Sequence, residues 1–273
     1  FATHEYGIVI NLMSYTALLM VLLTYGTETG FFRFATTDNK NNVFSTLMTS
    51  LSITTSLFSA RFSNESCASG SYAATFIFVL NTSTPLMGIL IITVSIDVIS
   101  SIPFALLRLE CRPIRFGIIK LLNIGLNIGL NLFFLLLCPF LEQKGIAVPF
   151  YNPNGGIVYI FISYLIASVF TFIMLLPYML KFRFYFSFGL LKCILKYSFP
   201  LLIVSLAGMI NLQGDKIMMP KILGEVMSQE EALSMTGIYG ANYKLALVMY
   251  IFTQGFRFAF EPFFFNYSKQ EDS

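Results

Sequence analysis

The chain has 273 residues, of which 56% are hydrophobic and only 11% are charged. Soluble domains carry about 25% charged residues, so this composition excludes a soluble globular class and predicts a membrane protein. The length allows about seven membrane helices joined by short loops. The formal net charge is only +3, and we expect no nucleic-acid partner.

Seven apolar segments follow in chain order, and we expect each to form a membrane helix. They are about 6–27, 43–60, 86–107, 116–138, 157–180, 197–212 and 238–256. The second is weak because it is rich in Ser and Thr, whose hydroxyls can bond to carbonyls of their own helix. The apolar run at 75–80 is too short to span a hydrocarbon core of ~30 Å. We expect Pro103 to kink the third helix near its end.

The charges between these segments favour one orientation. With the start of the chain outside, the basic connections fall on the cytoplasmic side, as the positive-inside rule requires. The cytoplasmic set is 31–42, 108–115, 181–196 and the residues after 257, and the external set is 61–85, 139–156 and 213–237. The stretch 181–196 alternates cations with aromatic residues, which is typical of a helix or turn at the lipid headgroups.

The fourth segment carries a polar stripe on an otherwise apolar helix. Its members are three, four and four residues apart and therefore share one helix face: Lys120, Asn123, Asn127 and Asn131. Such a stripe faces neighbouring helices or a watery cavity, not lipid. Two interpretations stay open, namely hydrogen bonds between helices and the lining of a passage. Gly125 and Gly129, on an adjacent face, favour close packing with another helix.

Other ionisable groups lie in or beside the predicted helices. Asp97 is near the middle of the third segment, where a carboxylate costs about 2.5–3.5 kcal/mol. It is either an ion-coupling group or a structural hydrogen-bond acceptor. Glu28 and Arg33, near the end of the first segment, are either functional groups or partners in a simple ion pair. The last segment places three more candidates on one face: Gln254, Arg257 and Glu261. The last two can instead form an i, i+4 ion pair.

The sequence gives no indication of a metal site, a bound cofactor or an enzyme. The four cysteines have no paired spacing, and His4 has no companion ligand. The motifs of zinc proteases, serine hydrolases and P-loop proteins are missing. The external connections are short, which leaves little room for a catalytic domain. A membrane glycan polymerase or transferase is the alternative from another functional class.

Five phrases in order along the chain resemble the O-antigen flippase-like, polysaccharide-exporting branch of the multidrug/oligosaccharidyl-lipid/polysaccharide (MOP) flippase superfamily. They are EYGIV at 5–9, LLTYGTETGFFRF at 22–34, SIPFALLRLECRPIRFGIIKLLNIGLNIGLNLFF at 101–134, YSFPLLIVSLAGMIN at 197–211 and GIYGANYKLALVMYIFTQGFRFAFEPFFF at 237–265. The chain departs from the family at the polar stretch 61–85 and at LRLECRP, where LRLENRP is typical.

The resemblance implies an all-α, MATE-like membrane bundle of two lobes around a central cavity. This chain would hold about helices 2–8, with 1–191 as the remainder of the N-terminal lobe and 192–273 as the start of the C-terminal lobe. The resemblance also implies a multi-pass protein of the bacterial inner membrane. Its substrate would be an undecaprenyl-diphosphate-linked oligosaccharide, flipped to the periplasmic leaflet by alternating access. Polysaccharide polymerase or assembly machinery is a candidate partner.

On this interpretation, basic residues hold the diphosphate at the cytoplasmic side and amides line the passage. The expected binding residues are Arg33, Arg108, Arg112, Arg115, Lys120, Asn123, Asn127, Asn131, Gln254 and Arg257. The ion-coupling candidates are Glu28, Asp97 and Glu261. The second hypothesis is a cation-coupled small-molecule exporter of the same superfamily. We expect a flippase cavity to be net cationic and an exporter cavity to be net acidic.

Overall fold

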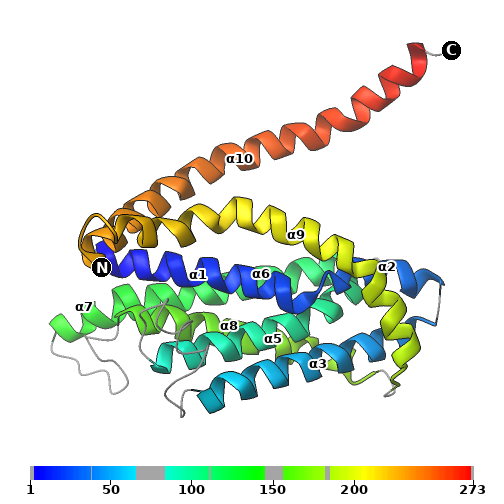
Figure 1. Ribbon diagram of the computed structural model, residues 1–273, viewed down its shortest axis with the longest axis horizontal. Helices are drawn as coiled ribbons and strands as arrows, with labels where there is room; N and C mark the ends of the chain where they lie inside the picture. Colours follow the sequence, from blue (N-terminus) through cyan, green and yellow to red (C-terminus); the bar gives the residue numbers. More distant parts are fainter. Residues whose placement is uncertain are drawn as a thin grey trace. The chain divides into compact units, whose positions relative to one another are not determined.

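The structure is a computed structural model of the chain. It describes residues 3–37, 39–65, 84–110, 112–144, 156–181 and 185–271. All regular secondary structure in these ranges is helical (Figure 1). The helices are α1 (Thr3–Thr24), α2 (Thr27–Thr37), α3 (Lys40–Glu65), α5 (Thr84–Leu109), α6 (Pro113–Leu132), α7 (Cys138–Gln143), α8 (Gly156–Met179), α9 (Phe188–Leu223) and α10 (Gln229–Glu271). A π-helical turn, Phe133–Leu137, joins α6 to α7.

Six helical stretches of the described chain are long and apolar enough to cross a membrane. They are Thr3–Thr36, Lys40–Arg61, Leu86–Leu109, Ile114–Glu142, Gly156–Met179 and Phe188–Leu223. These stretches cover the first six predicted segments, so the all-helical prediction is confirmed, and their length and apolar composition agree with a multi-pass membrane protein. The seventh segment, 238–256, is helical within α10 but is not among the six. The two-lobed arrangement stays a prediction.

Helix α9 is longer than the sequence predicts. It begins inside the expected connection 181–196 and ends inside the expected connection 213–237. The added turns are rich in Leu, Lys, Ile and Met, and several of these residues favour a helix by propensity. Polar and charged side chains in these turns therefore do not break the helix.

The chain forms two compact units. One comprises residues 12–214, and the other comprises residues 1–11 together with 215–273. The expected lobe boundary, between residues 191 and 192, falls inside α9 and stays a prediction.

The unit of residues 12–214 is a helical bundle around α5. Helix α5 packs against α3 and α8, and α8 packs against α6 (Figure 1). The main core joins α2, α3, α5 and the first turns of α9, and its most buried side chains include Phe31, Phe44, Leu47, Ile102 and Ile194. Lipid removes most of the hydrophobic drive between helices, so close van der Waals packing of these side chains holds the bundle together.

A short break separates α1 from α2. Helix α1 ends at Thr24, and Tyr25 and Gly26 both adopt positive φ angles, of 51° and 64°. A left-handed pair ends a helix because it breaks the repeating hydrogen-bond pattern. The predicted segment 6–27 therefore corresponds to α1, whereas the expected connection 31–42 is corrected, because its first residues continue helix α2 as far as Thr37. A side chain at Gly26 would also come within 3.3–3.4 Å of the α9 backbone.

The three basic connections of this unit lie at the same end of the bundle. Lys40 Nζ is 2.6 Å from Glu110 Oε1, which joins the start of α3 to the turn after α5. The Tyr185 amide donates to Ser45 Oγ over 2.7 Å, which brings the turn before α9 to the same place. The hydrogen bond from Lys40 holds the pKa of Glu110 below its ordinary value. Their expected clustering on one side of the membrane therefore agrees with the structure, and which side it is stays a prediction.

The second unit joins the start of α1 to the end of α9 and to α10. Thr3 and Ser234 share a hydroxyl hydrogen bond of 2.5 Å. Lys216, whose side chain is 6% exposed, lies 3.1 Å from Asp215 Oδ1. The hydroxyl of Tyr239 donates to the other oxygen of that carboxylate over 2.5 Å. This buried cation is therefore paired inside its own unit.

Candidate functional site

A cavity of about 360 Å³ lies inside the unit of residues 12–214. Side chains from α1, α2, α5, α6 and α8 line it. Five of the residues singled out from the sequence are among them: Glu28, Asp97, Arg108, Lys120 and Asn123. The bundle thus brings together residues that are up to 95 positions apart in the chain.

Three helices each present a stripe at helical spacing to this cavity. On α5 the stripe is Asp97, Ser101, Phe104 and Arg108. On α6 it is Phe116, Lys120 and Asn123, and on α8 it is Tyr164, Ser168 and Thr171. Spacings of three and four keep each set on one side of its helix. The cavity forms where these three faces meet.

Asp97 is held by groups from two other helices. Tyr164 of α8 donates its hydroxyl to Asp97 Oδ2 over 2.7 Å. The charge of Lys120 on α6 also acts on this carboxylate, and Ser168 of α8 lines the same cavity. A carboxylate at this depth needs such partners because it has left most of its water behind.

Both cations of the cavity also lie on aromatic rings. Arg108 Nη2 is 2.5 Å from Glu28 Oε2, and the two side chains are about 40% exposed. The Arg108 guanidinium lies 5.7 Å from the Phe116 ring centre, and Lys120 Nζ lies 4.3 Å from that of Phe104. Cation–π contacts of this kind hold a charge in place and leave part of it accessible.

The polar stripe of α6 divides into two parts. Asn123 lines the cavity and also donates through Nδ2 to Thr171 Oγ1 (2.7 Å) and to the Ala167 carbonyl (3.1 Å). Both interpretations of the stripe therefore apply to this residue. Asn131 donates to Asn127 Oδ1 over 2.9 Å, and neither residue lines this cavity. Of the three amides, this cavity therefore contains only that of Asn123, and a passage lined by all three stays a prediction.

The remaining side of α6 is open in the described part of the chain. Leu121 is 70% exposed and Ile128 is 54% exposed. A Cβ added at Gly125 or Gly129 would meet no described atom within 4 Å. The close helix packing expected at these glycines is therefore not found.

Three of the expected arginines lie outside the cavity. Arg33 covers the Tyr197 ring at 4.2 Å, and Arg112 Nε lies 3.3 Å from Glu110 Oε2. Arg115 donates to the Tyr178 hydroxyl over 3.2 Å. Three further candidates belong to α10, and their side chains lie outside the described residues: Gln254, Arg257 and Glu261.

Sequence reasoning missed the contribution of α8. The segment 157–180 looks uniformly apolar, yet it supplies Tyr164, Ser168 and Thr171 to the cavity. Their spacings of four and three repeat the pattern that drew attention to α6. A search for hydroxyls at helical spacing, in addition to amides and charges, would have found them.

The charges that line the cavity balance in number. Its described lining contains the cations Arg108 and Lys120 and the carboxylates Glu28 and Asp97. The net cationic lining expected for the flippase is therefore not found in this cavity. The excess of cations lies around it, at the end of the bundle where the basic connections gather.

Comparison of the chain with known protein families, with curated proteins and with solved structures found no match.

Proposed function

We propose that this chain belongs to a bacterial inner-membrane transporter. Its substrate is an undecaprenyl-diphosphate-linked oligosaccharide, which it flips from the cytoplasmic to the periplasmic leaflet. The observation that carries the proposal is the cavity in which Arg108, Lys120 and Asn123 come together inside a membrane-helix bundle. The resemblance of five sequence phrases to the flippase-like branch supports the same function. Transport of this kind needs no covalent chemistry from the protein.

The polar groups of the cavity suit the two parts of such a headgroup. Arginine and lysine form charge-assisted hydrogen bonds with phosphate oxygens. The amide oxygen of Asn123 and the hydroxyl oxygens of Ser101 and Thr171 can accept hydrogen bonds from sugar hydroxyls, because their own donor protons already bond within the bundle. Asn123 keeps its position because it already bonds to α8.

Carboxylates of the chain lie where an anionic ligand would bind. Glu28 neutralises Arg108, and Asp97 faces Lys120. An arriving diphosphate would exchange with these carboxylates and would not meet unpaired cations. Replacing Glu28 by the diphosphate at Arg108 costs little free energy, because an ion pair that is about 40% exposed contributes only about 0.2–1 kcal/mol.

The cavity volume limits what can bind at once. Small-molecule sites occupy about 300–1,000 Å³, and this cavity, at about 360 Å³, lies at the lower end. It can hold a diphosphate or one sugar, but not a whole oligosaccharide. The remaining sugars would need the larger opening that alternating access provides.

The two carboxylates favour one second candidate, a cation-coupled exporter of small molecules. In that case Asp97 and Glu28 bind the coupling cation or a cationic substrate. The two functions differ in the charge of the preferred ligand. A lipid diphosphate stabilises the purified flippase and a lipophilic cation does not, whereas the exporter shows the opposite preference.

Complementation tests the proposal. The full-length gene is expressed in a flippase-deficient strain, and surface glycan is compared for wild type, Lys120→Ala and Asn123→Ala. Asn127→Ala is the matched control, because it removes the same kind of amide from the same helix but outside the cavity. We expect both cavity variants to lose surface glycan and the control to keep it. Normal expression with full restoration by Lys120→Ala and Asn123→Ala would contradict the assignment.

A further inference from the structure

The first turns of α9 lie across one end of the membrane-helix bundle. Figure 1 shows this part of α9 running across the end of the bundle, whereas the following turns, up to residue 214, run along it. The helix contains Pro200, and an internal proline removes a backbone hydrogen bond and commonly bends a helix. Because the helices of the bundle cross the membrane, a segment across their ends lies parallel to the membrane plane.

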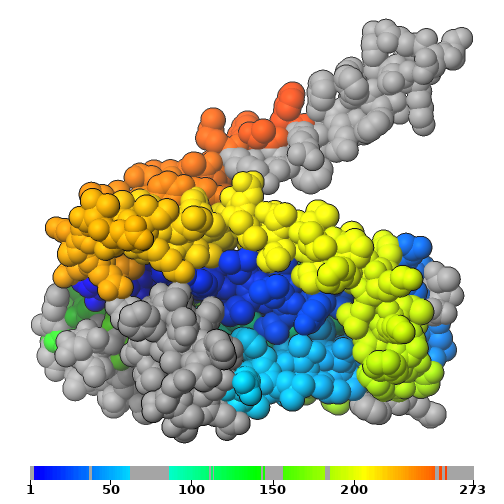
Figure 2. All heavy atoms as spheres, viewed as in Figure 1, coloured from blue at the N-terminus to red at the C-terminus, as the bar shows by residue number. Residues whose placement is uncertain are grey.

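One face of these turns is fixed to the bundle. Leu191 is 8% exposed, and Ile194 and Ser198 are fully buried. Helix α2 approaches them at Gly30, where a Cβ would lie 2.5 Å from Ser198 Oγ and 2.9 Å from Ile194 Cγ2. This close contact sets which side of α9 points outward. Figure 2 shows the segment, in yellow-green, on the surface beside α2 and α3.

The outward face combines aromatic residues with cations. Phe188 is 73% exposed and Phe199 is 61% exposed. Lys192 and Lys196 lie between them at helical spacing and are also exposed. Large apolar side chains on an exposed face mark a contact surface. Aromatic residues with flanking lysines suit the boundary between lipid headgroups and acyl chains, where each side chain finds its own environment.

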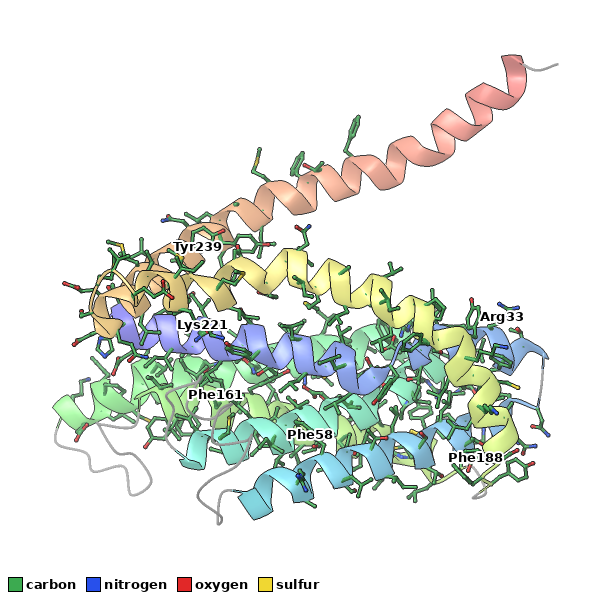
Figure 3. All side chains as sticks on the ribbon, viewed as in Figure 1. Arg33, Phe58, Phe161, Phe188, Lys221 and Tyr239 are labelled. Carbon is green, nitrogen blue, oxygen red and sulfur yellow. The ribbon has the colours of Figure 1, made fainter. Side chains whose placement is uncertain are left out.

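No acidic residue offsets these lysines along the sequence. The chain has no Asp or Glu between Glu142 and Asp215. Arg33, over the ring of Tyr197, adds a third cation beside this face. Figure 3 shows Arg33 and Phe188 at the same end of the bundle. This charge is complementary to anionic lipid headgroups, which attract cationic segments within about a Debye length.

We propose that the outward face of α9 from Phe188 to Phe199 is a binding surface for anionic phospholipids. Phe188 and Phe199 insert at the acyl boundary, and Lys192 and Lys196 contact headgroup phosphates. The surface is separate from the cavity, so this inference does not depend on the transport function. It assigns a role to the aromatic and basic stretch that the cavity leaves unused.

Fluorescence quenching tests this surface, since the chain contains no tryptophan. Phe188→Trp introduces a single reporter at an exposed position. The variant is placed in nanodiscs that contain brominated phosphatidylglycerol or brominated phosphatidylcholine. Phe133→Trp is the matched control, because Phe133 is 43% exposed and lies in the π-helical turn that follows α6. We expect the Phe188→Trp reporter to be quenched preferentially by the anionic lipid and by shallow bromines, and the Phe133→Trp reporter to show no lipid preference.

A charge variant separates lipid binding from simple exposure. Lys192→Gln with Lys196→Gln, in the Phe188→Trp background, removes the two lysines and keeps the aromatic residues. Each lysine near an anionic surface strengthens binding about fivefold, so the preference for the anionic lipid should fall by on the order of tenfold or more. Equal quenching by both lipids in the parent overturns the proposal. So does quenching by aqueous acrylamide alone, or protection from every quencher, which indicates a protein partner.

Discussion

The ion pair between Glu28 and Arg108 gives the sharpest prediction about the cavity. Arg108 Nη2 lies 2.5 Å from Glu28 Oε2, and both groups line the cavity. Glu28→Gln leaves the shape of the side chain nearly unchanged and removes its charge. An anionic ligand then no longer has to displace a carboxylate from the guanidinium. We therefore expect the variant to bind a polyprenyl diphosphate more tightly than the wild type.

The size of the effect follows from the exposure of the pair. Both side chains are about 40% exposed, and ion pairs in such surroundings contribute about 0.2–1 kcal/mol. If the ligand no longer has to break this ion pair, its binding free energy improves by the same amount, which corresponds to an affinity gain of about 1.4-fold to 5-fold. A larger gain would indicate that the carboxylate repels the ligand directly in addition to holding the arginine.

Isothermal titration of the purified protein in detergent measures this change. Glu110→Gln is the matched control, because it removes one carboxylate at the same end of the bundle. Glu110 pairs with Lys40 and does not line the cavity. We expect Glu28→Gln to lower the Kd and Glu110→Gln to leave it unchanged. An equal gain in affinity in both variants would show that only the net charge of the protein matters. A higher Kd in Glu28→Gln would refute the proposal that the ligand replaces this carboxylate at Arg108.

Three further predictions concern stability. The hydrogen bond from Lys40 lowers the pKa of Glu110, so the stability it adds is present above about pH 4.3 and is lost as the pH falls below that value. The difference in Tm between wild type and Glu110→Gln should shrink accordingly. Gly30→Ala should cost about 1–3 kcal/mol by overpacking, and added Ser198→Ala should recover part of the lost Tm, because it removes the closest atom. Tyr164→Phe removes the hydroxyl that bonds the cavity carboxylate, and Tm should fall by the equivalent of about 1–3 kcal/mol. An unchanged Tm in Gly30→Ala would contradict the close packing at Gly30, and an unchanged Tm in Tyr164→Phe would contradict its hydrogen bond to Asp97.

The membrane helices were predictable because their signal is local. An apolar run long enough to cross the bilayer needs no knowledge of its neighbours, and six predicted segments are helices of this kind. Helix α2 was missed because an 11-residue helix of mixed apolar and polar residues is too short to give a membrane-spanning signal. A helix or turn was expected within 181–196, but its continuation into one long helix, α9, was missed because the charged residues on both sides of 197–212 were taken to end the membrane helix.

The candidate site was predictable only in part because it depends on which helix faces meet. Asp97, Lys120 and Arg108 stood out by their charge alone, since charge is rare in these segments. The division of the asparagine stripe depends on where α8 lies against α6. Asn123 lies opposite Thr171, whereas Asn127 bonds to its own helix. The spacing of residues in the sequence shows that they share one face of a helix. It does not show how much of that face a neighbouring helix covers.

The central claim is that the cavity binds the anionic headgroup of a lipid, and paired affinities test it most directly. The Kd of a polyprenyl diphosphate and that of the uncharged polyprenol are measured for wild type, Lys120→Gln and the control Lys144→Gln, whose lysine lies outside the cavity. We predict that the diphosphate binds more tightly than the alcohol to the wild type. We also predict that Lys120→Gln weakens only the diphosphate, by on the order of tenfold, while Lys144→Gln changes neither. Equal affinities for the two lipids, or a Lys120→Gln variant that binds the diphosphate as the wild type does, would contradict the claim.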